Sequence, residues 1–133
     1  MVHGIGVDIV SKKSICEALE RNKEAFLKFV FTEEEIGYAC ETHDMISHLS
    51  AFFAAKESVI KSLGTGWKGG LRLTDIEVSH TVNGAPEINL SGNALKLSHS
   101  LGGVKVLVSL SIEDLYVIAN AIAVIPSDGS HDE

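Results

Sequence analysis

The chain has little cysteine, little positive charge and no long apolar run, and each shortage excludes a class of protein. Its two cysteines, Cys16 and Cys40, form neither a disulfide framework nor a CxxC metal spacing, so we expect free thiols and a cytoplasmic location. A net charge of −7 argues against a nucleic-acid-binding surface. No apolar run approaches the roughly 18 residues of a membrane span, and "MVHGIGVDIV" lacks the basic start of a signal peptide.

The length and composition are those of one globular unit. The 133 residues include 45% apolar and 22% charged residues, values close to the average for soluble domains. We therefore predict a single domain over residues 1–125. The polar segment after it, residues 126–133, begins at a proline and is predicted to be a disordered tail.

The periodicity of apolar residues changes along the chain, from one strand through several helices to a run of strands. This order predicts an α+β fold with a mostly antiparallel sheet packed with helices. The strand over 115–125 is apolar on both faces and is predicted to be buried. We expect strands over 2–10, 71–78, 86–90, 104–112 and 115–125, and helices over 11–31, 33–40, 45–63 and 91–102.

Local signals place the ends of these helices. Thr32 and Glu35 have the spacing of a capping box, and Asp44 is a candidate N-cap for the long central helix. Gly64 is suited to end that helix, and Ser11 is a candidate N-cap for the first one. The glycine-rich "GTGWKGG" that follows is predicted to be a loop, and it lacks the order of a P-loop.

Three charged residues have two interpretations each. Asp8 at the end of a strand is either the point where the strand reaches water or a ligand for a hard cation. Glu57 and Lys61 are four residues apart on a helix, which suits a surface pair worth roughly 0.2–0.5 kcal/mol. Because small residues and the glycine-rich loop surround them, they also suit a phosphorylated ligand and its metal, and Lys68 in the loop could contact a phosphate.

Five segments of the sequence together resemble one family, the holo-acyl-carrier-protein synthase type of 4′-phosphopantetheinyl transferase. The similarity extends in order from about residue 3 to residue 125. The segments are "GIGVDIV", "FTEEE", "FFAAKESVIKSLGTG", "DIEV…NGAPEINLSGNA" and "VSLS…LYVIANAIA". The resemblance implies transfer of 4′-phosphopantetheine from coenzyme A to a serine of an apo acyl carrier protein, with release of adenosine 3′,5′-bisphosphate. It also implies Mg²⁺ dependence and a homotrimer with active sites between subunits.

The resemblance assigns roles to particular residues. Asp8 and Glu57 match the metal-binding carboxylates, and with Lys61 they form the implied catalytic set. Glu57 is expected to act as ligand and base, and Lys61 to assist the leaving phosphate. The residues expected to line the coenzyme A site are Lys56, Lys61, Gly64, Thr65 and Gly66.

The sequence also departs from the family pattern. Relatives usually have an arginine at the position of Phe52, a histidine at that of Ile112 and a basic residue at that of Ser14. Lys12, Lys13 and Arg21 are the residues that could bind the acidic carrier protein instead. These departures leave an alternative, a non-catalytic relative that binds coenzyme A or a carrier without transfer.

Overall fold

The computed structural model describes residues 1–64 and 70–127 of the chain. The expectations for Thr65, Gly66 and Lys68, and for the tail after Ser127, therefore lie outside the described residues.

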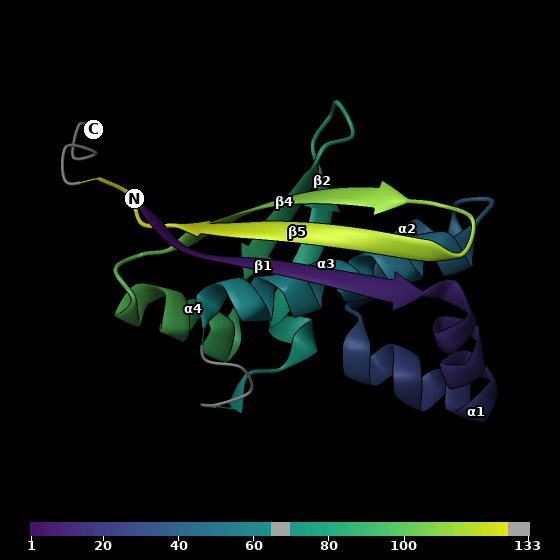
Figure 1. The fold of residues 1–133 in the computed structure, drawn as a ribbon. Helices are drawn as coiled ribbons and strands as arrows, with labels where there is room; N and C mark the ends of the chain where they lie inside the picture. Colours follow the sequence, from purple (N-terminus) through teal and green to yellow (C-terminus); the bar gives the residue numbers. More distant parts are fainter. Residues whose placement is uncertain (65–69, 128–133) are drawn as a thin grey trace.

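Within these limits the chain forms two antiparallel sheets and four α-helices, which confirms the predicted α+β class (Figure 1). One sheet has the strand order β1-β5-β4, and the other pairs β2 with β3. The described part of the chain contains no helix that is long and apolar enough to cross a membrane. The elements are β1 (Val2–Ser11), α1 (Lys12–Val30), α2 (Glu33–Cys40), α3 (Met45–Leu63), a 3₁₀ helix η2 (Leu73–Asp75), β2 (Ile76–His80), β3 (Pro86–Leu90), α4 (Gly92–Ser100), β4 (Lys105–Ile112) and β5 (Tyr116–Val124).

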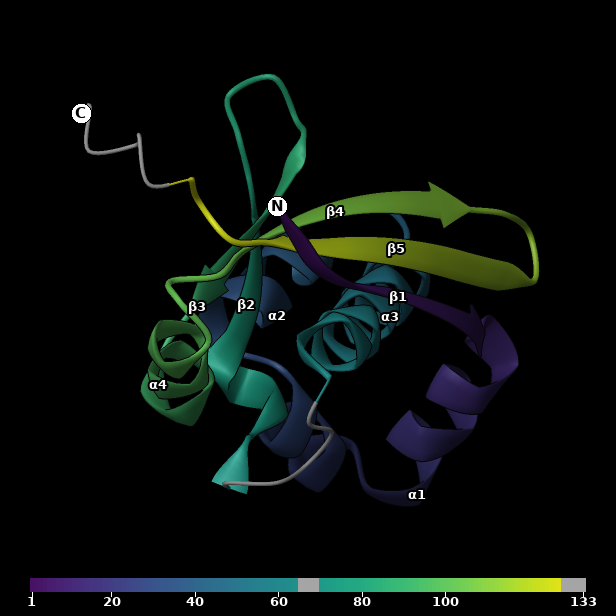
Figure 2. The same ribbon diagram turned by 60° about the vertical axis from the view of Figure 1, so that its left-hand side comes forward.

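The three-stranded sheet is covered by helix α3 on one face (Figure 2). On β5, alternate residues from Val117 to Ala123 are buried against the helix side, while Ile118 and Ile122 on the other face are 38% and 41% exposed. The expectation that this strand is buried on both faces is therefore wrong for the single chain. Side chains alternate across a strand, and among residues 1–64 and 70–127 a helix packs on one face of this sheet only.

Strand β1 approaches α3 so closely that two of its residues have no room for a side chain. A Cβ added to Gly4 would overlap the carbonyl oxygen of Ser62, and one added to Gly6 would overlap that of Ser58. Because every second residue of a strand faces the same side, Asp8 continues this row towards the helix. Ser58 and Ser62 are thus the helix residues on whose backbone β1 packs.

The predicted helix ends are largely confirmed. Thr32 and Glu35 form the capping box at the start of α2, and Asp44 caps α3 by accepting a hydrogen bond from the Ser47 N–H. Gly64 ends α3 with a φ of 87°, a conformation that glycine adopts without strain. Ser11 precedes the first residue of α1, as predicted, but its side chain makes no capping hydrogen bond.

Two local features differ from the prediction. Helix α1 breaks at Asn22, whose backbone is extended and whose side chain accepts a hydrogen bond from the Ala25 N–H, so a second helical segment starts there. The strand predicted from residue 71 begins only at Ile76, because residues 73–75 form a 3₁₀ turn.

The contact between β1 and α3 predicts a sharp difference between two glycine substitutions. Gly6→Ala should lower the free energy of unfolding by about 1–3 kcal/mol, the usual cost of overpacking. Gly37→Ala is the control, because Gly37 lies on helix α2 with no atom within 4 Å of an added Cβ. That variant should be as stable as the parent or more stable by up to about 1 kcal/mol. Urea unfolding measures both, and equal stability of the two variants would contradict this packing.

Candidate active site

Asp8, Glu57 and Lys61 lie together where the end of β1 meets the last turns of α3. The Lys61 ammonium is 3.2 Å from Asp8 Oδ1 and donates a hydrogen bond of 2.9 Å to the Val7 carbonyl oxygen. These contacts join residues more than fifty positions apart in the sequence. The close packing of β1 on α3 is what places Asp8 within reach of the helix.

Lys61 therefore pairs with Asp8, and not with Glu57 as an isolated helix would suggest. Among the described residues, no ion pair within 4.0 Å joins Lys61 to Glu57. The pair with Asp8 is partly open to solvent, since the lysine side chain is 53% exposed. Of the two interpretations of Glu57 and Lys61, the structure thus disfavours the simple surface pair.

Glu57 is held in conditions that favour its protonated form. Partial burial raises the pKa of Glu57, the nearby Asp8 carboxylate raises it further, and Lys61 opposes these two effects. Asp8 and Glu57 both line an open pocket of about 340 Å³, with Ser11, Ser14 and Phe53 on its other walls. Two carboxylates that repel one another across a pocket are suited to share a cation.

The donor set fits a metal that keeps other ligands. No group of three or more His, Cys, Asp or Glu side chains suited to hold a metal occurs in the part of the chain that the structure describes. Mg²⁺ commonly takes one or two protein carboxylates and fills its remaining positions with water and substrate phosphates. Two carboxylates beside an ammonium therefore suit a phosphorylated ligand with its Mg²⁺ better than a metal enclosed by protein.

Lys56 was expected to line the ligand site, and the structure contradicts this. Its side chain is 0% exposed, and its ammonium lies 2.8 Å from Glu35 Oε1. It also donates hydrogen bonds to the carbonyl oxygens of Leu73 and Ile76, so all three of its protons have a partner. Burial lowers the pKa of Lys56, and the Glu35 carboxylate opposes that shift.

Glu35 is the partner that the sequence reasoning missed. It was assigned only to the capping box, yet its carboxylate also accepts a hydrogen bond from the Val78 N–H and is buried. A signal was available for Lys56, which lies in the apolar stripe of α3. The neighbours in that stripe are Leu49, Phe52, Val59 and Leu63.

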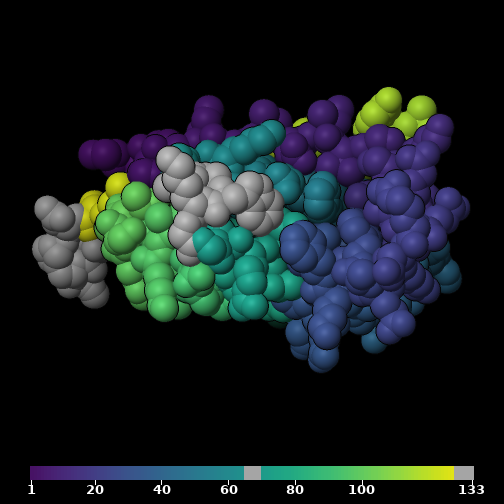
Figure 3. Space-filling model, turned by 90° about the horizontal axis from the view of Figure 1, so that it is seen from below, coloured from purple at the N-terminus to yellow at the C-terminus, as the bar shows by residue number. Residues whose placement is uncertain are grey.

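The remaining predicted residues of the described chain lie on α1 and at the end of α3, and none of them lines the pocket. Lys12, Lys13 and Arg21 lie on the first half of α1, which begins directly after the pocket residue Ser11. Gly64 lies at the end of α3 and is exposed. From below, the blue and violet surface of α1 and the green surface of α4 lie at opposite ends of the molecule (Figure 3).

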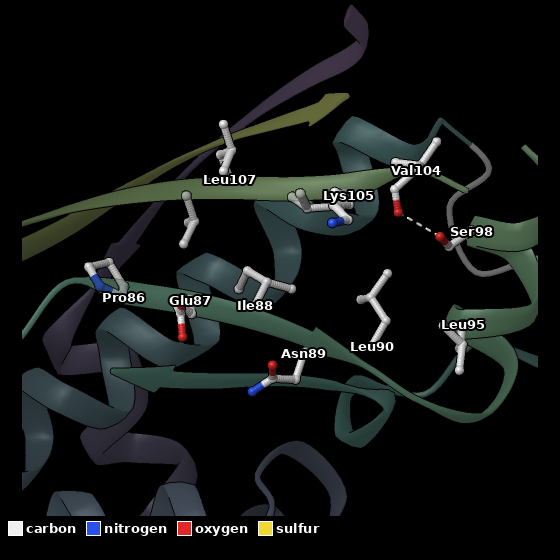
Figure 4. Close-up of a pocket in the computed structure, with 12 residues that line it drawn as sticks. Pro86, Glu87, Ile88, Asn89, Leu90, Leu95, Ser98, Val104, Lys105 and Leu107 are labelled. Carbon is white, nitrogen blue, oxygen red and sulfur yellow. Dashed lines mark hydrogen bonds between the residues drawn. The ribbon is translucent and has the colours of Figure 1, made fainter. Parts of the chain in front are cut away.

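A larger groove of about 470 Å³ lies elsewhere, between β3, α4 and β4 (Figure 4). Its walls include Ile88, Leu90 and Leu95, with Glu87 and Lys105 as its charged residues. None of the residues predicted for the site is among its described lining residues. Asp8 and Glu57 line the smaller pocket instead, which makes that pocket the candidate site.

Comparison with known proteins identifies relatives over nearly the whole chain. Residues 4–120 match the family described as the 4′-phosphopantetheinyl transferase superfamily. The holo-[acyl-carrier-protein] synthase of Koribacter versatilis is 34% identical over 122 residues, covering 92% of this chain and 98% of that protein.

Solved structures with the same fold include two holo-[acyl-carrier-protein] synthases. The enzyme from Neisseria meningitidis superposes with a TM-score of 0.87 at 32% identity, covering 93% of this chain and 99% of that one. The enzyme from Helicobacter pylori, solved in complex with coenzyme A, gives 0.79 at 29% identity, covering 90% and 99%.

The two lysines of α3 should differ strongly in their effect on stability. Lys56→Met leaves Glu35 buried without its cation and should lower the free energy of unfolding by about 3–5 kcal/mol. Lys61→Met, on the same helix, removes the partly solvent-exposed pair with Asp8. It should lower the free energy of unfolding by no more than about 1 kcal/mol. Urea unfolding of the two variants measures the difference. A Lys56→Met variant as stable as Lys61→Met would show that the buried pair does not form.

Proposed function

Since this chain belongs to the 4′-phosphopantetheinyl transferase superfamily, we propose that it is a holo-[acyl-carrier-protein] synthase. It transfers 4′-phosphopantetheine from coenzyme A to a serine of an apo acyl carrier protein and releases adenosine 3′,5′-bisphosphate. The observation that carries the proposal is that Asp8 and Glu57 line one pocket, with the Lys61 ammonium hydrogen-bonded to Asp8. The names of its relatives and the coenzyme A complex of the Helicobacter pylori enzyme support the choice of substrates.

In the proposed mechanism, each of the three residues has a separate task. Mg²⁺ held by Asp8 and Glu57 would supply positive charge to the coenzyme A diphosphate. Lys61 is anchored beside Asp8 and would supply positive charge to the phosphate that leaves. Glu57 accepts the serine proton, as the carboxylate of the pocket nearest to the helix that carries Lys61.

We place the carrier protein on helix α1. Lys13 and Arg21 are exposed on this helix and offer positive charge to an acidic partner, with Lys12 at its first turn. Ser11 and Ser14 lie at the start of the same helix and line the pocket that contains Glu57. A carrier bound along α1 would therefore bring its serine close to the proposed base.

A homotrimer in the cytoplasm completes the proposal. The outer face of the β1-β5-β4 sheet is largely apolar, and opposite residues across it include Ile5, Ile122 and Leu107, which are 72%, 41% and 64% exposed. Such a contiguous apolar face is typical of a surface that another protein covers, and here copies of the same chain are the proposed partners. Cys16 and Cys40 are free, as the reducing cytoplasm requires.

The first test of this function is a transfer assay on apo carrier proteins with coenzyme A and Mg²⁺. Intact-mass analysis should show the addition of one phosphopantetheine group. Asp8→Asn and Glu57→Gln should each lower the rate by about 100-fold or more. Glu87→Gln, an exposed change on β3, is the control and should leave the rate unchanged.

Two outcomes would count against the proposal. Full activity of the Glu57→Gln variant would show that Glu57 is not the base that accepts the serine proton. Absence of transfer to every carrier of the source organism would favour the alternative, a non-catalytic relative.

The proposed assembly predicts that a charge on the outer sheet face separates the subunits. Ile122→Lys should convert a trimer into monomers, because its partner surface would have to bury an unpaired ammonium. Val82→Lys on the β2–β3 hairpin is the control, since Val82 is fully exposed and is not part of the β1-β5-β4 sheet. Light scattering measures the mass of each species, and a trimeric Ile122→Lys protein would exclude this face as the interface.

A further inference from the structure

The pocket lined by Asp8 and Glu57 also contains two hydroxyl groups of the chain itself. Ser11 and Ser14 line it, together with Phe53. Ser11 is the last residue of β1, and Ser14 lies in the first turn of α1, which continues directly from that strand (Figure 1). Helix α1 packs against α3, the helix that carries Glu57. The fold therefore brings hydroxyl oxygens and the proposed base of one chain into the same pocket.

Ser14 is the more accessible of the two serines. It is exposed, whereas Ser11 is half-buried. The Ser14 hydroxyl donates a hydrogen bond of 2.7 Å to the Ser11 carbonyl oxygen. A hydroxyl has one hydrogen and two lone pairs, so this bond holds the side chain in one orientation and leaves the lone pairs of Oγ available. Ser14 thus presents to the pocket the oxygen that a nucleophile requires.

The serine of a carrier would have to enter this same pocket, because Glu57 is the proposed acceptor of its proton. A hydroxyl on the pocket wall is present there before any carrier binds. Reacting groups held within one molecule have a high effective concentration, so even an imperfectly aligned hydroxyl competes when the external acceptor is absent. The described lining of the pocket offers no cysteine or lysine as another nucleophile.

We propose that Ser14 is itself an acceptor, so that without a carrier the chain transfers 4′-phosphopantetheine from coenzyme A to its own Ser14. The inference rests on the proposed transferase function. The Ser14 Oγ forms a bond to the pantetheine-linked phosphorus while the phosphoanhydride bond breaks. The hydroxyl proton passes to Glu57, and adenosine 3′,5′-bisphosphate leaves with the electron pair of the broken bond. The product is a phosphodiester at the start of α1.

The test is intact-mass analysis of the unmodified protein after incubation with coenzyme A and Mg²⁺ and without a carrier. A reductant in the reaction prevents mixed disulfides between coenzyme A and the free thiols of Cys16 and Cys40. The chain should gain the mass of one phosphopantetheine group, and peptide fragmentation should locate that group at Ser14. An unchanged mass, or a group located at any other residue, would overturn the proposal.

Three variants check the assignment to Ser14. Ser14→Ala should abolish the mass gain, and Glu57→Gln should slow it by about 100-fold. Ser100→Ala is the matched control and should be modified as fast as the parent. Ser100 is exposed at the end of α4 and donates the same kind of hydrogen bond, 2.8 Å long, to the carbonyl oxygen of Leu97, but it does not line this pocket. Equal modification of the two alanine variants would contradict the assignment.

The dependence on protein concentration separates reaction within one molecule from transfer between molecules. Ser14 and Glu57 line one pocket of a single chain, so the rate constant for the mass gain should be the same over a hundredfold dilution. A rate constant that falls in proportion to the dilution would require two molecules to meet, and it would overturn the proposal.

A parallel reaction that contains an apo carrier keeps this inference separate from the proposed function. If the carrier gains the group and the chain alone never does, self-modification is excluded while the proposed function stands. If neither the carrier nor the chain gains mass, the proposed reaction fails, and this inference fails with it.

Discussion

Strand β1 packs directly on helix α3 because Gly4 and Gly6 present no Cβ to the carbonyl oxygens of Ser62 and Ser58. The rest of the site depends on this contact. It places Asp8, the next residue on the same face of the strand, beside the helix that carries Glu57 and Lys61. Any larger residue at position 6 would push the strand, and with it Asp8, away from the helix.

The buried pair of Glu35 and Lys56 has a different part in the fold. Lys56 joins α3 to the carbonyl oxygens of Leu73 and Ile76, and Glu35 joins the start of α2 to Val78 on β2. These bonds connect the second sheet to the central helix, one residue before Glu57. A buried pair is expensive to desolvate and is retained only where its hydrogen bonds are complete, as they are here. The two charged residues of "AAKE" thus differ in role, since Lys56 stabilises the fold and Glu57 lines the pocket.

Local chemistry explains what could be predicted from the sequence. The capping box of Thr32 and Glu35, the cap at Asp44 and the glycine at position 64 depend on neighbouring residues alone, so the helix ends were found. The break at Asn22 has no proline or glycine to mark it and was missed. The strand over Tyr116–Val124 was predicted, but its exposed outer face was not, because composition does not show whether a second layer covers a sheet.

The site itself was predicted by resemblance more than by spacing. Nothing in the sequence places Asp8 next to Lys61, because their pairing depends on how a strand packs on a helix fifty residues later. The predicted role of Lys56 was wrong because every residue of the family motif was expected to face the ligand. The place of Lys56 in the apolar stripe of α3 was overlooked. In the same way, only the fold shows that Phe52 and Ile112 share a pocket. Long-range packing is the information that the sequence patterns lacked.

The most direct measurement is a crystal structure of this protein with coenzyme A and Mg²⁺. We expect one cation bound by oxygens of both Asp8 and Glu57 at about 2.0–2.1 Å, and shared with the coenzyme A diphosphate. Lys61 should remain near Asp8 and contact a phosphate oxygen. A diphosphate bound away from these residues, or a cation held by neither carboxylate, would contradict it.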